Sequence, residues 1–456
     1  MNWMKLITVY ITNYNYGDYI RKAIESVLNQ TVQNFELLVI DDGSTDHSKE
    51  IIESYRNDSR ISIIYQQNKG LNRTNNVALE LANGRYIMRL DADDYLREDA
   101  LQKLSEKLES DSELGLVFPN YYLVNKENVI ISEEVRHDFD REVELFDQAA
   151  HGACTMIRTD FLRSLGGYNE NYTCQDGYEL WVKFTRKYKV SNVSEPLFYY
   201  RQHGANLTSN ENRILDTRAK INADYVQRSG KNTNSLIVIP VRGGEKDLAF
   251  RKLGKTNFIS KKVTQALSSE NGVHIVITSP DNKVWEALDD NLKGNEKISF
   301  HHRSEEKARF NTSLDGTLQD ILEIDEIDQL RFKCITLITI EYPFLKSHKI
   351  DDAIHTMFLF GADSLLSVRA DNSVYYNHKG DGLHPIMERD QFTKLERDTL
   401  FRHSGGVSVV LRSHFEVSKK LISGRIGHMI IDQESAFGVF SEYDFQLAQL
   451  LEINSQ

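Results

Sequence analysis

A short apolar segment of this chain runs directly into three carboxylates. The segment is residues 86–90, and the acids are Asp91, Asp93 and Asp94. Carboxylates add little to a core, but the carboxyl edge of an open α/β sheet is where such folds bind ligands. Oxygen ligands suit divalent cations such as Mg²⁺, which share them with substrate phosphates. We therefore expect an Asp-X-Asp site for a cation and a nucleotide diphosphate. The alternative is a solvated acidic turn.

The bulk properties of the chain argue against several classes of protein. At 456 residues it is too long for one ordinary core, so we expect two or three domains. A net charge of -12 argues against a protein that binds nucleic acid by neutralising phosphates. No apolar run approaches the roughly 18 residues that span a bilayer, and the first residues lack the layout of a signal peptide. Three widely spaced cysteines indicate neither a disulfide framework nor a zinc motif, which favours a cytoplasmic protein.

Strand and helix patterns alternate along the first half of the chain. We expect strands at residues 6–11, 35–40, 61–65 and 86–90, and helices at 20–28 and 72–83. The second helix should stop at Gly84. Such alternation indicates βαβ units and a largely parallel sheet. A polar stretch at 228–234 precedes a second alternation, so we predict domains at residues 1–231 and 232–456.

Motifs within residues 5–210 arrive in the order found in one enzyme family. They lie at residues 6–17, 23–31, 39–46, 84–94, 165–168, 175–181 and 199–203. With these motifs the first domain resembles family 2 glycosyltransferases of the GT-A fold. The resemblance implies a Rossmann-like sheet that binds a nucleotide-sugar donor at its carboxyl edge.

The same resemblance implies roles for the residues at the strand ends. Asp41 matches the position that hydrogen-bonds the nucleotide base, although a turn before a helix cap explains this residue as well. Asp91 is expected nearer the ribose and diphosphate, and Asp93 is expected to be the more direct ligand of Mn²⁺ or Mg²⁺. Three residues of the first strand end should also lie on the nucleotide side, namely Thr12, Tyr14 and Asn15.

The later motifs imply a base and further ligands. An inverting transfer needs a base for the acceptor hydroxyl, and Asp176 stands where the family places it, here preceded by Gln175. A helix cap is the alternative for Asp176. His203 matches a late metal ligand in related enzymes, and an exposed loop histidine is the alternative. Arg201 is expected to pair with the diphosphate or with an acidic neighbour.

The first domain departs from the family pattern after the third strand. Many relatives carry an arginine where this chain has Asn75, and Arg73 is the candidate to supply that charge. The departure affects expectations about the donor rather than about the fold.

The second domain opens with residues 237–246, a predicted strand followed by a Gly-rich basic loop. Backbone N–H groups in such loops can cradle phosphates. Together with residues 351–354, 361–368 and 441–448, this loop resembles acylneuraminate cytidylyltransferases, which make CMP-activated acidic sugars. Two departures stand out: Glu245 replaces the usual serine, and residues 437–441 lack the carboxylate pair for Mg²⁺. We therefore expect a degenerate cytidylyltransferase-like domain that binds a ligand or partner or mediates homodimerisation.

Taken together, the sequence predicts an α/β chain with two Rossmann-like nucleotide-diphospho-sugar transferase (GT-A-like) domains in tandem. The expected function is inverting, metal-dependent transfer from a nucleotide sugar, with a UDP-sugar as the expected donor. The acceptor would be a glycan or a lipid-linked glycoconjugate in surface polysaccharide biosynthesis, and docking at the inner face of a membrane stays open. The alternatives are a bifunctional glycosyltransferase and CMP-sugar synthetase, or a non-catalytic scaffold of a glycan pathway.

Overall fold

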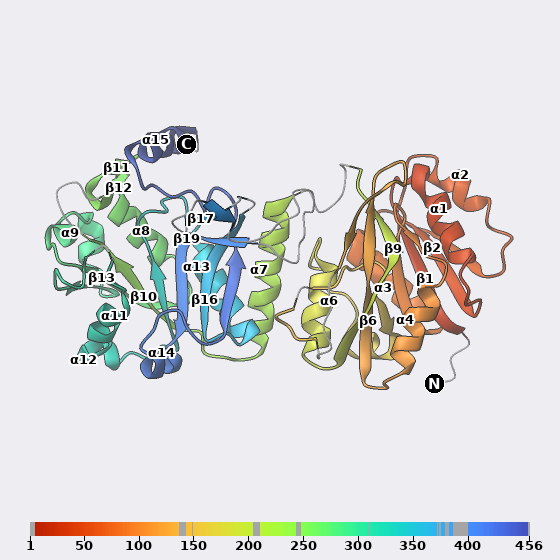
Figure 1. Cartoon of the computed structure of the whole chain (residues 1–456), viewed down its shortest axis with the longest axis horizontal. Coiled ribbons are helices and arrows are strands. Elements are labelled where there is room, and N and C mark those ends of the chain that lie inside the picture. Colours follow the sequence, from red (N-terminus) through yellow and green to blue (C-terminus); the bar gives the residue numbers. More distant parts are fainter. Residues whose placement is uncertain are drawn as a thin grey trace. The chain divides into compact units, whose positions relative to one another are not determined.

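The structure is a computed structural model. It describes residues 5–135, 143–147, 149–203, 210–242, 248–309, 311–371, 373, 375–378, 383–385 and 400–454. The chain forms two compact units, one of residues 1–218 with 374–398 and one of residues 219–373 with 399–456 (Figure 1). This division falls within helix α7 (Glu211–Arg228). Domain limits at residue 231 stay a prediction.

The first unit is built on a nine-stranded sheet of the described residues. Its strands are β1 (Lys5–Asn13), β2 (Phe35–Asp41), β3 (Ile61–Tyr65), β4 (Gly84–Asp91), β5 (Tyr95–Leu96), β6 (Leu114–Val124), β7 (Ile130–Glu134), β8 (Met156–Arg158) and β9 (Lys189–Arg201). Its helices before α7 are α1 (Gly17–Leu28), α2 (Ser48–Glu53), α3 (Leu71–Leu81), α4 (Ala100–Glu109), α5 (Thr159–Ser164) and α6 (Asp176–Thr185). A short pair, β17 (Tyr376–His378) and β18 (Leu383–Pro385), comes from the later segment of this unit.

The strand order of this sheet is β3-β2-β1-β4-β8-β6-β9-β5, with β7 beside β6. The strands from β3 to β4 are parallel, as the alternation predicts, and β8 runs antiparallel to both β4 and β6. The α/β class is therefore confirmed. The antiparallel insertion is a feature that the sequence pattern did not indicate.

The two faces of this sheet are covered by different helices. Alternate residues of β1 point to opposite faces, so Val9 packs with α1, α2 and α4, whereas Tyr10 packs with α3, α5 and α6. Every helix thus buries one apolar stripe against the sheet. The arrangement leaves the carboxyl ends of β1, β2 and β4 together at one edge of the sheet.

The helix α3 ends earlier than expected, and Gly84 has a different role. The helix stops at Leu81, and Gly84 is the first residue of β4. A Cβ atom there would lie 2.3 Å from the backbone nitrogen of Thr8. The expectation of a helix stop was therefore wrong, because this glycine is needed for the close approach of two strands.

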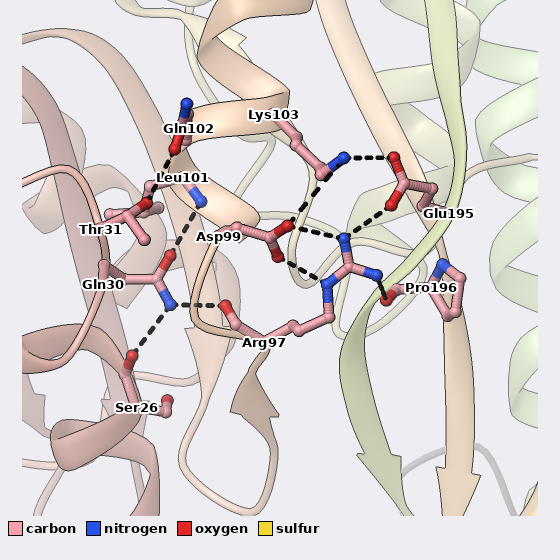
Figure 2. A network of polar contacts seen from close by, with 10 residues as sticks. All are labelled: Ser26, Gln30, Thr31, Arg97, Asp99, Leu101, Gln102, Lys103, Glu195 and Pro196. Carbon is pink, nitrogen blue, oxygen red and sulfur yellow. Dashed lines mark hydrogen bonds and ion pairs between the residues drawn. The ribbon is translucent and has the colours of Figure 1, made fainter.

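A polar network ties the end of α1 to the start of α4 and to β9 (Figure 2). The buried Gln30 amide donates to the carbonyl of Arg97 at 2.6 Å and accepts from the backbone N–H of Leu101 at 2.9 Å. The Arg97 guanidinium in turn contacts Asp99 at 2.6 Å and Glu195 at 2.8 Å. Because β9 carries Glu195 near its middle and ends beside the candidate site, this network fixes the strand that delivers the late site residues.

The second unit contains a separate seven-stranded sheet of the described residues. Its strands are β10 (Ser235–Pro240), β13 (Gly272–Ser279), β14 (Ile298–His302), β15 (Cys334–Ile338), β16 (Ser364–Asp371), β19 (Leu400–Leu411) and β20 (Ile426–Ile430), and a small pair is formed by β11 (Lys252–Leu253) and β12 (Thr256–Asn257). Its helices are α8 (Phe258–Leu267), α9 (Lys283–Glu286), α10 (Asp290–Lys293), α11 (Asp315–Leu322), α12 (Asp325–Asp328), α13 (His348–Phe360), α14 (Arg412–Ser418) and α15 (Glu442–Asn454), with a 3₁₀ turn at Leu248–Phe250.

The second sheet repeats the connectivity of the first. Its order is β14-β13-β10-β15-β19-β16-β20. The strands from β14 to β15 are parallel, β19 is antiparallel to both β15 and β16, and β20 is parallel to β16. In the first sheet the antiparallel strand β8 lies between β4 and β6, and in the second sheet the antiparallel strand β19 lies between β15 and β16. No helix among the described residues is both long and apolar enough to cross a membrane.

Candidate active site

The carboxyl edge of the first sheet collects the predicted strand-end residues. In the parallel register Thr12 lies opposite Asp91, and Asn13 lies opposite Asp41. The structure thus brings Thr12, Asp41 and Asp91 to one edge. This follows from the topology, because neighbouring parallel strands end at the same side of the sheet.

Asp41 is held in place by its neighbours. Its side chain is buried, and one oxygen accepts from the Asn13 amide at 2.7 Å while the other accepts from the backbone N–H of Ser44 at 2.9 Å. The Asn13 amide also donates to the Ser44 hydroxyl at 3.0 Å. Asn13 is a positioning residue that sequence reasoning missed, although its place directly after Thr12 at a strand end could have indicated it.

The other predicted nucleotide-side residues differ in their surroundings. Asn15 adopts a left-handed conformation with φ of 61°, and its side-chain oxygen accepts from the backbone N–H of Thr45 at 2.8 Å. The side chain of Asn15 is therefore already engaged in joining two loops. Tyr14 is 47% exposed at the same strand end. Contact of either residue with a nucleotide stays a prediction.

The Asp-X-Asp segment lies where β4 ends. Asp93 is buried, and its carboxylate lies 2.9 Å from the His203 imidazole. Asp94 is also buried and accepts from the backbone N–H of Arg201 at 2.9 Å. Burial raises the pKa of Asp91 to about 6, and burial together with the charge of Asp93 holds the pKa of Asp94 well above its ordinary value. Clustered carboxylates of this kind are stabilised by a nearby cation.

The fit of these residues to a divalent cation can be tested on their geometry. Among the described residues, no group of three or more His, Cys, Asp or Glu side chains is arranged around a common metal position. Asp93 and His203 nevertheless converge, and Asp91 lies two residues away on the same segment. Magnesium sites of nucleotide enzymes commonly take one or two protein ligands and complete their shell with phosphates and water. The donor set fits such an open site.

Arg201 lies against the acidic segment, which supplies the acidic neighbours that are one of its two expected kinds of partner. Its guanidinium is buried and donates to the carbonyl of Asp93 at 2.7 Å and to the carbonyl of Lys126 at 3.2 Å. These bonds fix the turn that carries the acids. A contact between Arg201 and a diphosphate stays a prediction.

The candidate base Asp176 is the first residue of α6. Gln175 precedes it with φ of 64°, a left-handed conformation that sets the start of the helix. The Asp176 carboxylate is buried and pairs closely with the guanidinium of Arg89, whose other edge contacts Asp91 at 2.9 Å. Arg89 was missed from the sequence. Its position two residues before Asp91, on the same face of β4, was the available signal.

Arg73 is the candidate to supply a charge near Asn75. Its guanidinium pairs with Glu170 at 3.2 Å, and both side chains are largely exposed. Asn75 is buried and accepts from the Tyr10 hydroxyl at 3.3 Å. A role of Arg73 in supplying that charge stays a prediction.

Comparison with known proteins identifies the class of this unit. Residues 8–166 match the family described as Glycosyl transferase family 2. An uncharacterized glycosyltransferase of Haemophilus influenzae is 30% identical over 231 residues, which cover 47% of this chain and 71% of that protein. The chain belongs to glycosyl transferase family 2, and its first unit is an α/β transferase domain of that family.

Other relatives are much longer proteins. The chondroitin synthase of Pasteurella multocida is 31% identical over 226 residues, which cover 49% of this chain and 23% of that protein. The hyaluronan synthase of Pasteurella multocida is 30% identical, with 45% of this chain and 21% of that protein covered. This chain therefore spans less than a quarter of the length of either synthase. The solved structure of Staphylococcus aureus TarS 1-349 with UDP-GlcNAc is 19% identical over 50% of this chain and 70% of that chain, with a TM-score of 0.43.

Proposed function

We propose that the first unit is an inverting, metal-dependent glycosyltransferase that uses a nucleotide sugar, with a UDP-sugar as the donor. The observation that carries this proposal is one sheet edge on which Asp93 and His203 converge at 2.9 Å and to which Asp176 also belongs through Arg89. Transfer from a nucleotide sugar needs a cation for the charged diphosphate and a base for the acceptor hydroxyl, and this edge carries candidates for both.

The side chains divide the work of the reaction. Thr12, Tyr14, Asn15 and Asp41 would hold the nucleotide, with Asp41 facing the base. Asp93 and His203, with Asp91, would hold Mn²⁺ or Mg²⁺, which supplies positive charge to the departing diphosphate. Asp176 accepts the proton of the acceptor hydroxyl while that oxygen attacks the anomeric carbon. The bond from this carbon to the diphosphate oxygen breaks, and the configuration at the carbon inverts.

The relatives support a polysaccharide product. They include chondroitin and hyaluronan synthases and a putative teichuronic acid biosynthesis glycosyltransferase. We propose a glycan or lipid-linked acceptor in surface polysaccharide biosynthesis. The three cysteines are buried and form no disulfide, which supports a cytoplasmic location, with a lipid-linked acceptor met at the inner face of the membrane.

Two substitutions separate binding from chemistry. We expect Asp176→Asn to bind UDP with Mn²⁺ as the unmodified chain does in calorimetry, yet to keep only a small residual rate of sugar transfer. Asp93→Asn should lose the Mn²⁺-dependent part of UDP binding. Asp290→Asn, at a carboxylate that is 99% exposed, is the matched control and should change neither property. Full transfer by both site variants would refute the roles proposed for Asp93 and Asp176, whereas a chain that binds UDP but transfers no sugar in any form would favour a scaffold.

For the second unit we propose a degenerate cytidylyltransferase-like domain. The shared strand order of the two sheets supports a second GT-A-like domain. Ser441 near the altered motif caps α15, because its hydroxyl accepts from the backbone N–H of Asp444 at 3.2 Å and donates to the Asp444 carboxylate at 2.8 Å, so Asp444 serves the start of the helix. Residues 243–247, which include Glu245, lie outside the described residues. A ligand-binding or homodimerisation role is proposed, and the alternative of an active CMP-sugar synthetase predicts release of pyrophosphate from CTP with an acidic sugar.

A further inference from the structure

One buried arginine lies between the donor side of the site and the base. Arg89 is 5% exposed. Its Nε lies 2.9 Å from an Asp91 oxygen, and its Nη1 pairs closely with an oxygen of Asp176. A single guanidinium thus contacts two carboxylates that are separated by 85 positions in the sequence. Its rigid planar fork fixes the directions of both contacts, whereas the ammonium of a lysine is a point charge on a flexible stem.

The backbone around Arg89 fixes where its side chain can go. Arg89 and Asp91 share one face of β4, because residues two apart in a strand point the same way. The carbonyl of Arg89 accepts from the backbone N–H of Cys154 at 2.7 Å, which anchors the strand at this position. The guanidinium is therefore presented to Asp176 from a rigid element rather than from a loop.

The backbone of Gly152 lies against the Arg89–Asp176 pair. A Cβ atom on Gly152 would lie 2.8 Å from the Asp176 carboxylate and 2.9 Å from the Arg89 guanidinium. Gly177 packs in turn against Gly152, since a Cβ atom on Gly177 would lie 2.8 Å from the backbone nitrogen of Gly152. Gly152 is thus held between the ion pair and the first turn of α6. Little space remains for the Asp176 carboxylate to turn away.

We propose that Arg89 is a positioning residue that holds the Asp176 carboxylate in its working orientation and links it to Asp91 on the donor side. This inference rests on the proposed function. Arg89 acts through Asp176, so removal of Arg89 should matter only while that carboxylate is present.

A double-mutant cycle tests this dependence directly. Arg89→Met should lower kcat by about 100-fold, the cost of moving a reacting group by about 1 Å, with the donor KM within about threefold. In an Asp176→Asn background, the same substitution should change the residual rate by less than about twofold. Arg89→Lys should recover part of kcat because it restores the positive charge between the two carboxylates but not the fixed geometry of the guanidinium.

Arg85→Met is the matched control. Arg85 lies on the same strand and pairs with Glu109 at 2.7 Å away from the site, so its loss should leave kcat unchanged. If Arg89→Met fails to fold, as judged by thermal unfolding, the same cycle is measured with Arg89→Lys. Equal fractional losses with and without the Asp176 carboxylate would overturn the inference. An unmodified chain that turns over no donor would refute the proposed function and the inference with it.

Discussion

Gly152→Ala is the smallest change that should disturb the proposed base without removing any functional group. The added Cβ would lie 2.8 Å from the Asp176 carboxylate and 2.9 Å from the Arg89 guanidinium. These distances fall about 0.6 Å short of an ordinary contact of 3.4 Å. The φ angle of Gly152 lies outside the left-handed region, so alanine brings crowding without backbone strain.

The expected loss follows from the size of the displacement. The two side chains cannot yield independently, because they are paired with each other and are both buried. A misplacement of 1 Å can cost about 100-fold in rate, so a shift of about half that distance should lower kcat by about 10- to 100-fold. Overpacking of this kind should also cost about 1–3 kcal/mol of stability.

The assay is release of nucleotide from the donor with acceptor present, measured as kcat and donor KM. Gly294→Ala is the matched control, since nothing lies within 4 Å of its Cβ, and it should leave both constants unchanged. Thermal unfolding of each variant checks that the chain remains folded. A Gly152→Ala enzyme with kcat within about twofold of the unmodified chain would refute the packing argument.

Three further substitutions test other parts of the account. Gln30→Leu should lower the free energy of unfolding of the first unit by about 2 kcal/mol in denaturant titration (Figure 2). The substitution leaves the backbone N–H of Leu101 without its acceptor and removes one of the two donors to the Arg97 carbonyl, which keeps the N–H of Ala100. Lys262→Met should raise the unfolding temperature of the second unit most at pH 7 and below. Burial lowers the pKa of Lys262 from 10.5 to about 7, so at pH 7 and below the folded state carries a buried charge that the unfolded state exposes to water. The gain in unfolding temperature from Lys262→Met should therefore vanish as the pH rises towards about 10. Asn13→Ala should weaken UDP binding about tenfold in calorimetry, because the Asp41 carboxylate loses its 2.7 Å contact with the Asn13 amide, a bond of about 1.5 kcal/mol or more. An unchanged value in any one of these measurements would contradict the argument for that residue.

Local sequence signals predicted the parts of the site that lie at strand and helix ends. Asp41 and Asp91 end β2 and β4, and Asp176 begins α6, as the patterns indicated. Such positions can be predicted because the parallel topology alone brings strand ends together.

Contacts between distant segments could not be predicted in the same way. The pairing of Arg89 with Asp176 depends on how α6 returns to β4, and no local pattern encodes that path. The expected helix stop at Gly84 failed for the same reason, since the need for glycine comes from the neighbouring strand. The partner of Arg73 could not be read locally either, because Glu170 lies 97 positions further along the chain.

The second unit shows the limit of motif-based inference most clearly. Its alternation predicted strands and helices, and the observed strand order matches that of the first sheet. The antiparallel strand β19 lies between β15 and β16 although it follows both in the chain. Connectivity of this kind is set by the packing of the whole sheet rather than by the residues of one strand.

Metal-dependent transfer from a nucleotide sugar at the Asp93 site is the reaction proposed for the first unit. The most direct test is to incubate the chain with UDP-, GDP-, dTDP- and CMP-sugars in the presence of Mn²⁺, Mg²⁺ or EDTA and to measure the free nucleotide released. We expect release from one donor, UDP-linked, that requires the metal and is lost in Asp93→Asn. Equal release with EDTA, or by Asp93→Asn, would contradict the account.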